Sequence, residues 1–245
     1  MTLLSVEHVG KTHQVGPYTK RVLVDVSLSI RSGDLFGVWG AQRSGKSTLL
    51  RIAAGLETAD SGAVRFDGTD LASLPKTRRD RLRLDQIGLV QREGPHSNAF
   101  SVLDWVANPL FNRYTRRVAR NRAMAMLRRV DVAECHDGCW HQLSDSEKTL
   151  VSLAHGLVRE PRLLLVDDPT AGLDTLQQQE VTELLRAVTG QEQVAVLMTS
   201  SVLSAITDAQ EAFTLSDGRL IPVTDTSRPG AEVIEFPCGD QQTGS

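Results

Sequence analysis

The chain has few cysteines, few aromatic residues and no long apolar run. Three cysteines among 245 residues are too few, and too odd in number, for a disulfide framework. Aromatic residues make up 4% of the sequence, and no apolar stretch approaches the roughly 18 to 20 residues needed to cross a bilayer. The first residues lack the charged start and apolar core of a secretion signal. We therefore expect a cytoplasmic chain.

The chain also lacks an excess of either charge. Its formal net charge is −3 and its isoelectric point is about 6.1. Basic residues gather between positions 76 and 83, but Asp80 and Asp85 interrupt them, which favours a solvated helix face. We therefore expect no nucleic-acid partner. A length of 245 residues is enough for one α/β domain with a modest insertion.

One run of residues points directly to phosphate binding. It fits the pattern G-x-x-x-x-G-K-[ST], with a strand-like apolar segment before it and a helical segment after it. Backbone N–H groups of such a loop surround phosphates, its lysine reaches the β- and γ-phosphates, and its first hydroxyl binds Mg²⁺. The predicted binding residues are Gly40, Ala41, Gln42, Arg43, Ser44, Gly45, Lys46, Ser47 and Thr48.

Strand patterns and helix patterns alternate along the chain. Residues 163–166 form a continuous apolar run that ends in two aspartates, as expected for a strand buried on both faces. Hairpins are predicted at Asp67-Gly68 and Asp217-Gly218. Apolar residues recur with helical spacing between 101 and 130 and again over 175–188. This order predicts a mostly parallel sheet with the phosphate loop at the carboxyl end of a strand.

Further motifs follow the phosphate loop in a recognisable order. Leu143–Glu147, the strand Leu163–Asp168 and the loop Pro169–Asp174 have the order and spacing of an ABC transporter ATPase subunit. The resemblance covers roughly residues 3 to 223. Within that family, residues 101–110 resemble the branch that serves lipoprotein release and macrolide export. The longer link expected between the first two strands, Gln14 to Arg21, fits that branch too.

The resemblance implies a fold, a division of the chain and a dimer. The implied fold is a P-loop NTPase of ABC ATPase type, with a mostly parallel sheet core, an antiparallel β subdomain and a helical insertion. Residues 1–224 would form this single domain, with core and β subdomain at about 1–92 and 161–224 and the helical subdomain at about 93–160. Residues 225–245 would be a weakly ordered tail. Two such subunits dimerise head to tail in the family.

Several residues match the family's nucleotide-binding positions. By this resemblance Lys46 and Ser47 hold phosphate and Mg²⁺, and Asp167 supports Mg²⁺. Asp174 lies in the loop expected to cross the dimer interface. Each ATP lies between one subunit's phosphate loop and the other's signature motif, which begins here at Ser144. The resemblance therefore implies ATP and Mg²⁺ as cofactors.

Two expected catalytic positions depart from the family pattern. The residue after Asp167 is normally a glutamate that polarises the attacking water, and here it is Asp168, which is one methylene shorter. The family's switch histidine falls on Ser200, which carries no charge. A reacting group misplaced by about 1 Å costs roughly 100-fold in rate. We expect Asp168 and Ser200 to be the catalytic residues of an ATPase that is slow or depends on a partner subunit.

Two other positions leave alternatives open. The glutamine that contacts Mg²⁺ and senses the membrane partner aligns with Arg92, but Gln91 stands one place earlier. Arginine cannot bind Mg²⁺, so a slip of one residue would assign this role to Gln91. The aromatic residue that stacks on adenine aligns near His13, and Tyr18 is a competitor.

The signature motif is altered as well. The family's Ser-Gly-Gly-Gln is replaced by Ser144-Asp145-Ser146-Glu147, which spells a capping box that starts a helix. Two carboxylates repel a triphosphate, so a phosphate contact at Ser144 would be weakened. Arg43 replaces a glycine of the family's loop. One hypothesis pairs it across a dimer with Asp145, Glu147 or ATP, and the alternative is a plain surface arginine.

Two functions compete. The first is the ATP-binding subunit of an ABC transporter, peripheral on the inner face of the cell membrane and docked on a separate integral membrane permease through about Glu93 to Glu160. The alternative is a non-transport regulator that uses ATP-dependent dimerisation as a switch. A homodimer predicts very slow turnover, because both sites would carry the altered residues. A heterodimer with an intact subunit leaves a route to usable hydrolysis.

Overall fold

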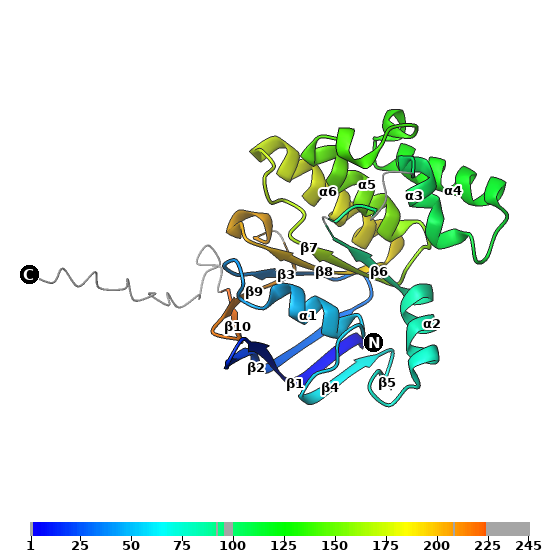
Figure 1. Ribbon diagram of the computed structural model, residues 1–245. Coiled ribbons are helices and arrows are strands. Elements are labelled where there is room, and N and C mark those ends of the chain that lie inside the picture. The colour runs from blue at the N-terminus through cyan, green and yellow to red at the C-terminus, as the bar shows by residue number, and fades with distance from the viewer. Residues whose placement is uncertain (1, 92, 96–99, 208, 224–245) are drawn as a thin grey trace, which may run out of the picture.

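The structure is a computed structural model that describes residues 2–91, 93–95, 100–207 and 209–223. Two β-sheets and a group of helices make up the molecule (Figure 1). The strands are β1 (Thr2–Val15), β2 (Tyr18–Arg31), β3 (Leu35–Trp39), β4 (Ser61–Phe66), β5 (Thr69–Asp70), β6 (Ile87–Val90), β7 (Leu163–Asp167), β8 (Ala195–Ser200), β9 (Glu211–Ser216) and β10 (Arg219–Pro222). The α-helices are α1 (Lys46–Ala53), α2 (Lys76–Gln86), α3 (Val102–Ala107), α4 (Arg116–Arg129), α5 (Asp145–Leu157) and α6 (Thr175–Glu192).

The larger sheet has the strand order β10-β9-β3-β8-β7-β6. Its strands run parallel from β9 to β6, and only β10 is antiparallel. Residues 163–166 of β7 are fully buried, which confirms the prediction of a strand covered on both faces. Because parallel strands end at one edge of a sheet, the ends of β3, β7 and β8 lie together. The register pairs Trp39 with Ser200 and Asp167 with Thr199.

The smaller sheet is antiparallel, with the order β2-β1-β4-β5. The longer link expected over Gln14 to Arg21 is wrong, because β1 and β2 pair as far as Val15 and Tyr18. β-Branched and aromatic residues continue the ladder there, and the chain reverses at residues 16–17, where Gly16 takes a φ of 61°. Helix α1 packs between the two sheets in one shared hydrophobic core (Figure 1).

Both predicted tight hairpins are confirmed. β4 and β5 meet at Asp67-Gly68, and β9 and β10 meet at Asp217-Gly218. All four turn residues have positive φ, between 49° and 76°. Two successive positive φ values suit the right-handed twist of the flanking strands, and Asp-Gly accepts them easily.

The predicted helical segments are confirmed as α3 and α4, and as α6, which continues to Glu192. Helices α3, α4 and α5 share a hydrophobic core of their own around Ala119, Ala123 and Leu127. This group lies away from the antiparallel sheet (Figure 1). Among the described residues no helix is long and apolar enough to cross a membrane. Arg92 and the expected tail at 225–245 lie outside the described residues.

Candidate active site

A cavity of about 720 Å³ opens at the edge where the parallel strands end. It is lined by the phosphate loop, by the end of β7 and by the β1–β2 hairpin. Sequence positions more than 150 residues apart thereby meet at one site. The residues that line it are His13, Val15, Lys20, Val22, Gln42, Arg43, Ser44, Gly45, Lys46, Ser47, Thr48, Gln91, Glu93, Asp167 and Asp168.

The phosphate loop owes its shape to glycine. Gly45 precedes α1 with a φ of 112°, a conformation that residues with side chains rarely adopt. A Cβ atom there would lie 2.8 Å from the carbonyl oxygen of Val22, and one on Gly40 would lie 2.6 Å from Ser44 Oγ. Only glycine therefore lets the loop close over the start of α1, where free N–H groups and the helix dipole favour an anion.

Lys46 is held inside the loop rather than in solvent. Its residue exposure is 7%, and its Nζ donates to the carbonyl oxygens of Gly40 at 2.5 Å and Ala41 at 2.9 Å. Burial lowers the pKa of Lys46, and the charges of Asp168 and Asp167 act in the opposite direction. The ammonium thus lies near both the anion-binding loop and the two carboxylates. From there it can contact a phosphate bound in the loop.

The two aspartates at the end of β7 have different surroundings. Asp167 Oδ1 accepts a 2.8 Å hydrogen bond from Thr199 Oγ1 on the paired strand β8. Asp168 accepts two bonds from Ser201, one from the backbone N–H to Oδ1 at 3.0 Å and one from Oγ to Oδ2 at 2.8 Å. Both carboxylates line the cavity. The sequence identified the aspartates but not Thr199 or Ser201 as their partners.

Ser200 does not line the cavity. Its side chain is fully buried, and its Oγ lies 3.1 Å from Thr170 Oγ1 and accepts a 2.9 Å bond from the N–H of Val202. These contacts shape the loop after β8. The structure therefore places Ser201, not Ser200, against Asp168, and a catalytic role for Ser200 remains a prediction.

Ser144 also lies outside this cavity, at the start of α5. The predicted capping box is confirmed: Ser144 Oγ accepts from the N–H of Glu147 at 3.3 Å, and Glu147 Oε2 accepts from the N–H of Ser144 at 2.7 Å. Hydrogen bonds from Ser144 hold the pKa of Glu147 below its usual value. The carboxylate is thus occupied by its own helix, while Asp145 remains exposed.

Of the two candidates for the adenine platform, His13 is at the site. Its ring lines the cavity, and its Nε2 lies 2.8 Å from Glu57 Oε1. Glu57 also contacts Lys11 and Arg51, so a small charged cluster holds the His13 ring in place. Tyr18 is 77% exposed and is not part of the lining.

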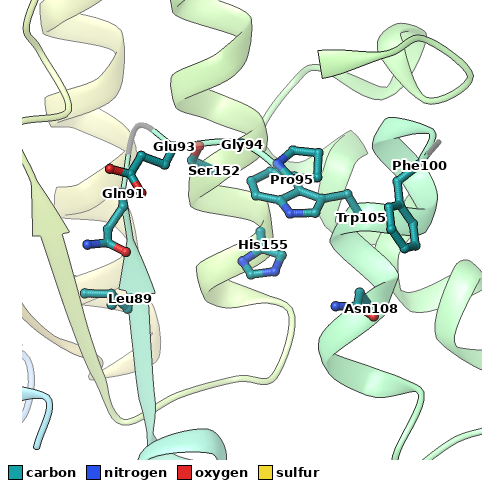
Figure 2. A pocket seen from close by; sticks show the side chains of 10 residues that line it. All are labelled: Leu89, Gln91, Glu93, Gly94, Pro95, Phe100, Trp105, Asn108, Ser152 and His155. Carbon is teal, nitrogen blue, oxygen red and sulfur yellow. The ribbon is translucent and has the colours of Figure 1, made fainter. Parts of the chain in front are cut away.

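Gln91 follows β6 and lines two cavities. The second cavity, of about 360 Å³, lies toward the helical group. Figure 2 shows Gln91 and Glu93 on one side of it and Trp105 and Phe100 on the other. The ring of His155 stacks on Trp105 with centroids 4.4 Å apart, and burial lowers the pKa of His155 to about 4. Gln91 and Glu93 thus connect the two cavities.

The first cavity fits a nucleoside triphosphate with Mg²⁺. Its volume is within the range of about 300 to 1,000 Å³ typical of small-molecule sites. Ser44 Oγ is buried and has no hydrogen-bond partner among the described residues, so a phosphate oxygen would satisfy it. Ser47, Asp167 and Gln91 offer the hydroxyl, carboxylate and amide oxygens that Mg²⁺ prefers.

A family model described as "ABC transporter" matches residues 23–171. This range is more than half of the chain and contains the phosphate loop and both aspartates of the cavity. The chain belongs to the ABC transporter family. As a member it is an ATP-binding cassette and an ATPase, as the resemblance of its motifs implied.

Similar proteins support the same branch of the ABC family. The chain is 36% identical over 220 residues to "Lipoprotein-releasing system ATP-binding protein LolD" of Bordetella pertussis, covering 89% of this chain and 95% of that protein. It is 30% identical over 240 residues to "Macrolide export ATP-binding/permease protein MacB" of Bordetella avium, covering 98% of this chain but 36% of that protein. The predicted resemblance to the lipoprotein-release and macrolide-export branch is confirmed.

Solved structures of ABC cassettes have the same fold. The chain superposes with a TM-score of 0.83 and 25% identity on "Dimeric Structure of MJ0796, a Bacterial ABC Transporter Cassette", covering 89% of this chain and 96% of that one. The same protein in a post-hydrolysis state bound to ADP and Pi gives a TM-score of 0.82. The predicted fold class, an ABC-type P-loop NTPase, is confirmed.

Proposed function

We propose that this ABC ATPase is the ATP-binding subunit that drives a separate integral membrane permease, and that its own hydrolysis is slow. The observation that carries the proposal is the single cavity that joins the phosphate loop, the two aspartates of β7 and His13. Because these residues line one cavity, we assign them to the phosphates, the attacking water and the base of one bound nucleotide.

The proposed roles follow the chemistry of the lining. Residues 40–48, which include Lys46, hold the phosphates, and His13 stacks on the adenine. Ser47, Asp167 and Gln91 hold Mg²⁺, which when bound offsets the negative charge of the phosphates. Gln91 is preferred for this role over Arg92 because an amide oxygen can bind Mg²⁺ and a guanidinium cannot, and the side chain of Gln91 lines the cavity. Asp168 is the carboxylate that accepts the proton of the attacking water.

We propose that the subunit works as a head-to-tail dimer. Ser144 lies outside the cavity of its own chain, so its signature motif is free to face a second subunit. Glu147 is engaged in its capping box and Asp145 is exposed beside Lys148, 3.5 Å away. If Arg43 pairs with a carboxylate across the interface, we therefore favour Asp145, and ATP is the alternative partner. The dimer is a homodimer or includes a second ABC ATPase subunit.

The second cavity is the proposed contact with the permease. Its aromatic wall comes from the helical group, and Gln91 and Glu93 connect it to the nucleotide cavity. A permease seated there would sense the occupancy of the site. The subunit would then be peripheral on the inner face of the membrane.

Membrane recovery with and without the permease tests this proposal. The chain would be expressed alone and together with a candidate ABC permease, and its share in washed membranes measured. We expect recovery only with the permease, lost in Phe100→Asp at the cavity and retained in Leu84→Asp, an equally exposed site on α2. Equal recovery without the permease would contradict the proposal. So would a soluble ATP-dependent dimer that does not bind the permease, and that result would favour a regulatory switch.

A further inference from the structure

Both carboxylate oxygens of Asp168 are held by one residue. The N–H of Ser201 donates to Oδ1 at 3.0 Å, and its hydroxyl donates to Oδ2 at 2.8 Å. We propose that Ser201 is a positioning residue that fixes Asp168 for activation of the attacking water. This inference rests on the proposed ATP hydrolysis at the cavity. It assigns Ser201 a positioning role that the sequence alone did not indicate.

The loop that carries Ser201 is itself fixed. Ser200 Oγ accepts the N–H of Val202 at 2.9 Å and lies 3.1 Å from the hydroxyl of Thr170, so the turn after β8 is bonded to the loop after β7. The N–H of Asp168 donates to the carbonyl oxygen of Thr199 at 3.0 Å. Two adjacent strand ends therefore set the distance between the carboxylate and Ser201.

Asp168 adopts a backbone conformation that needs such support. Its φ is 48°, in the left-handed region that residues with a Cβ rarely enter. Backbone conformations of this kind are unfavourable for most residues other than glycine, and they persist where surrounding contacts hold them in place. The hydrogen bonds with Ser201 and Thr199 hold Asp168 in this conformation.

Ser201 contacts the carboxylate of Asp168 without being part of the cavity lining. Asp168 itself lines the cavity. An ionised carboxylate offers about four lone-pair positions, and Ser201 occupies two of them. The remaining positions are left for a water on the cavity side. An aspartate is shorter than the glutamate usual at this place. Its carboxylate therefore reaches the attacking water only when it is held in the right orientation.

In the reaction, Asp168 is the base and Ser201 orients it. The water oxygen forms a bond to the γ-phosphorus while the bond from that phosphorus to the β–γ bridging oxygen breaks. The water proton passes to Asp168, and ADP leaves with the bridging oxygen and its electron pair. Phosphate and ADP are the products, and Ser201 keeps its protons throughout. It acts only through the geometry of its partner.

Steady-state kinetics of the full chain test this role. We expect Ser201→Ala to lower kcat for ATP about 10- to 100-fold, as for a base displaced by up to about 1 Å, with KM unchanged. Ser201→Thr keeps the hydroxyl and should restore most of kcat. Ser204→Ala, exposed on the same loop, is the matched control. Nucleotide affinity, measured with a fluorescent ATP analogue, should be equal in all four proteins.

Two further readouts separate positioning from general structure. In the Asp168→Ala background, Ser201→Ala should change single-turnover hydrolysis no further, because Ser201 acts only through Asp168. In the nucleotide-free chain, amide hydrogen exchange over residues 199–203 should be faster in Asp168→Ala, since the N–H of Ser201 loses its acceptor.

Each other outcome has a definite meaning. An unchanged or raised kcat in Ser201→Ala, or an equal further loss in the Asp168→Ala background, overturns the inference while leaving the proposed function intact. A wild-type chain that binds the ATP analogue but hydrolyses no ATP, with or without its permease, overturns both. A wild-type chain that binds no nucleotide contradicts the proposed function itself.

Discussion

Lys46 and Asp168 face one cavity with opposite charges. Lys46 is bonded to two carbonyl oxygens of its own loop and is buried beside both aspartates. A triphosphate that enters this site meets a cation already held in place, so little ordering is needed on binding. Asp168 is equally restrained, by Ser201. In the proposed function, binding by Lys46 and cleavage by Asp168 thus depend on separate side chains, each fixed by its own contacts.

Replacing Lys46 should weaken nucleotide binding without unfolding the chain. A hydrogen bond that involves a charged group contributes about 1.5 to 3 kcal/mol, which corresponds to roughly 10- to 150-fold in affinity. We therefore expect Lys46→Ala to bind a fluorescent ATP analogue at least about tenfold more weakly. Lys148→Ala, which loses only a 3.5 Å surface contact with Asp145, should bind normally. Equal affinity of the two variants would show that the cavity is not the nucleotide site.

Sequence patterns indicated the proposed binding residues more readily than the partners that hold them. A phosphate loop is visible because its glycines and lysine have fixed spacing, and the apolar run before Asp167 marks a strand end. Ser200 and Ser201 are chemically alike in the sequence. Ser200 is the last residue of β8 and its hydroxyl lies against Thr170 in the core, whereas Ser201 follows the strand and its hydroxyl donates to Asp168. The sequence assigned the switch position to Ser200 and did not indicate that Ser201 contacts Asp168.

At the scale of elements, helix starts are fixed by their own side chains. Asp174 caps α6 and Gln177 bonds back to it, in the same reciprocal arrangement as Ser144 and Glu147 at α5. The capping box of α5 could be predicted because it depends on residues three apart. The extent of the β1–β2 hairpin could not, since Val15 and Tyr18 favour a strand while Gly16 and the polar residues around it are equally compatible with a loop.

Removal of the cap of α5 should destabilise the chain. Ser144→Ala leaves the N–H of Glu147 without its acceptor, which costs about 1 kcal/mol. We expect this loss in urea unfolding at neutral pH. Ser146→Ala, two residues along the same turn, should cost less because its hydroxyl makes only a 3.3 Å contact with Ser144. If both variants were equally stable, the altered signature would not be acting as a helix cap.

The stack of His155 on Trp105 should make stability depend on pH. Burial lowers the pKa of His155 to about 4, from 6.5 for the free side chain. The unfolded chain therefore binds a proton at pH values where the folded chain does not, and stability falls as the pH drops from about 6.5 toward 4. Between pH 7 and pH 5 the loss should be about 2 kcal/mol.

His155→Phe tests this contribution by urea unfolding at both pH values. The phenyl ring keeps an aromatic face against Trp105 but cannot be protonated. We expect the variant to lose about 2 kcal/mol less than wild type between pH 7 and pH 5. An identical pH dependence in the two proteins would mean that His155 is not kept neutral by the fold.

At the scale of the whole molecule, two cavities lie on either side of the segment after β6. One lies against the phosphate loop and the other against the helical group with its own core. Gln91 and Glu93 are common to both. The order and spacing of its motifs were sufficient to predict the fold class, because they mark the phosphate loop and the strand ends that define an ABC cassette. The second cavity was not predictable, since its walls come from segments far apart in the sequence.

The proposed dimer can be tested by reversing one pair of charges. Arg43→Glu and Asp145→Arg should each weaken ATP-dependent dimerisation, measured by light scattering, because each places like charges across the interface. The double variant should recover most of it. Lys76→Glu, exposed on α2, serves as the control for net charge. A double variant no better than the single ones would rule out this pair.

The central claim is that the chain holds ATP well and cleaves it slowly because its base is an aspartate. Steady-state ATPase activity of the purified wild type and of Asp168→Glu tests it most directly. We predict that Asp168→Glu raises kcat about tenfold or more, since a positioned base is worth roughly 10² to 10⁴ in rate, while KM stays the same. An equal or lower kcat in Asp168→Glu would contradict the account.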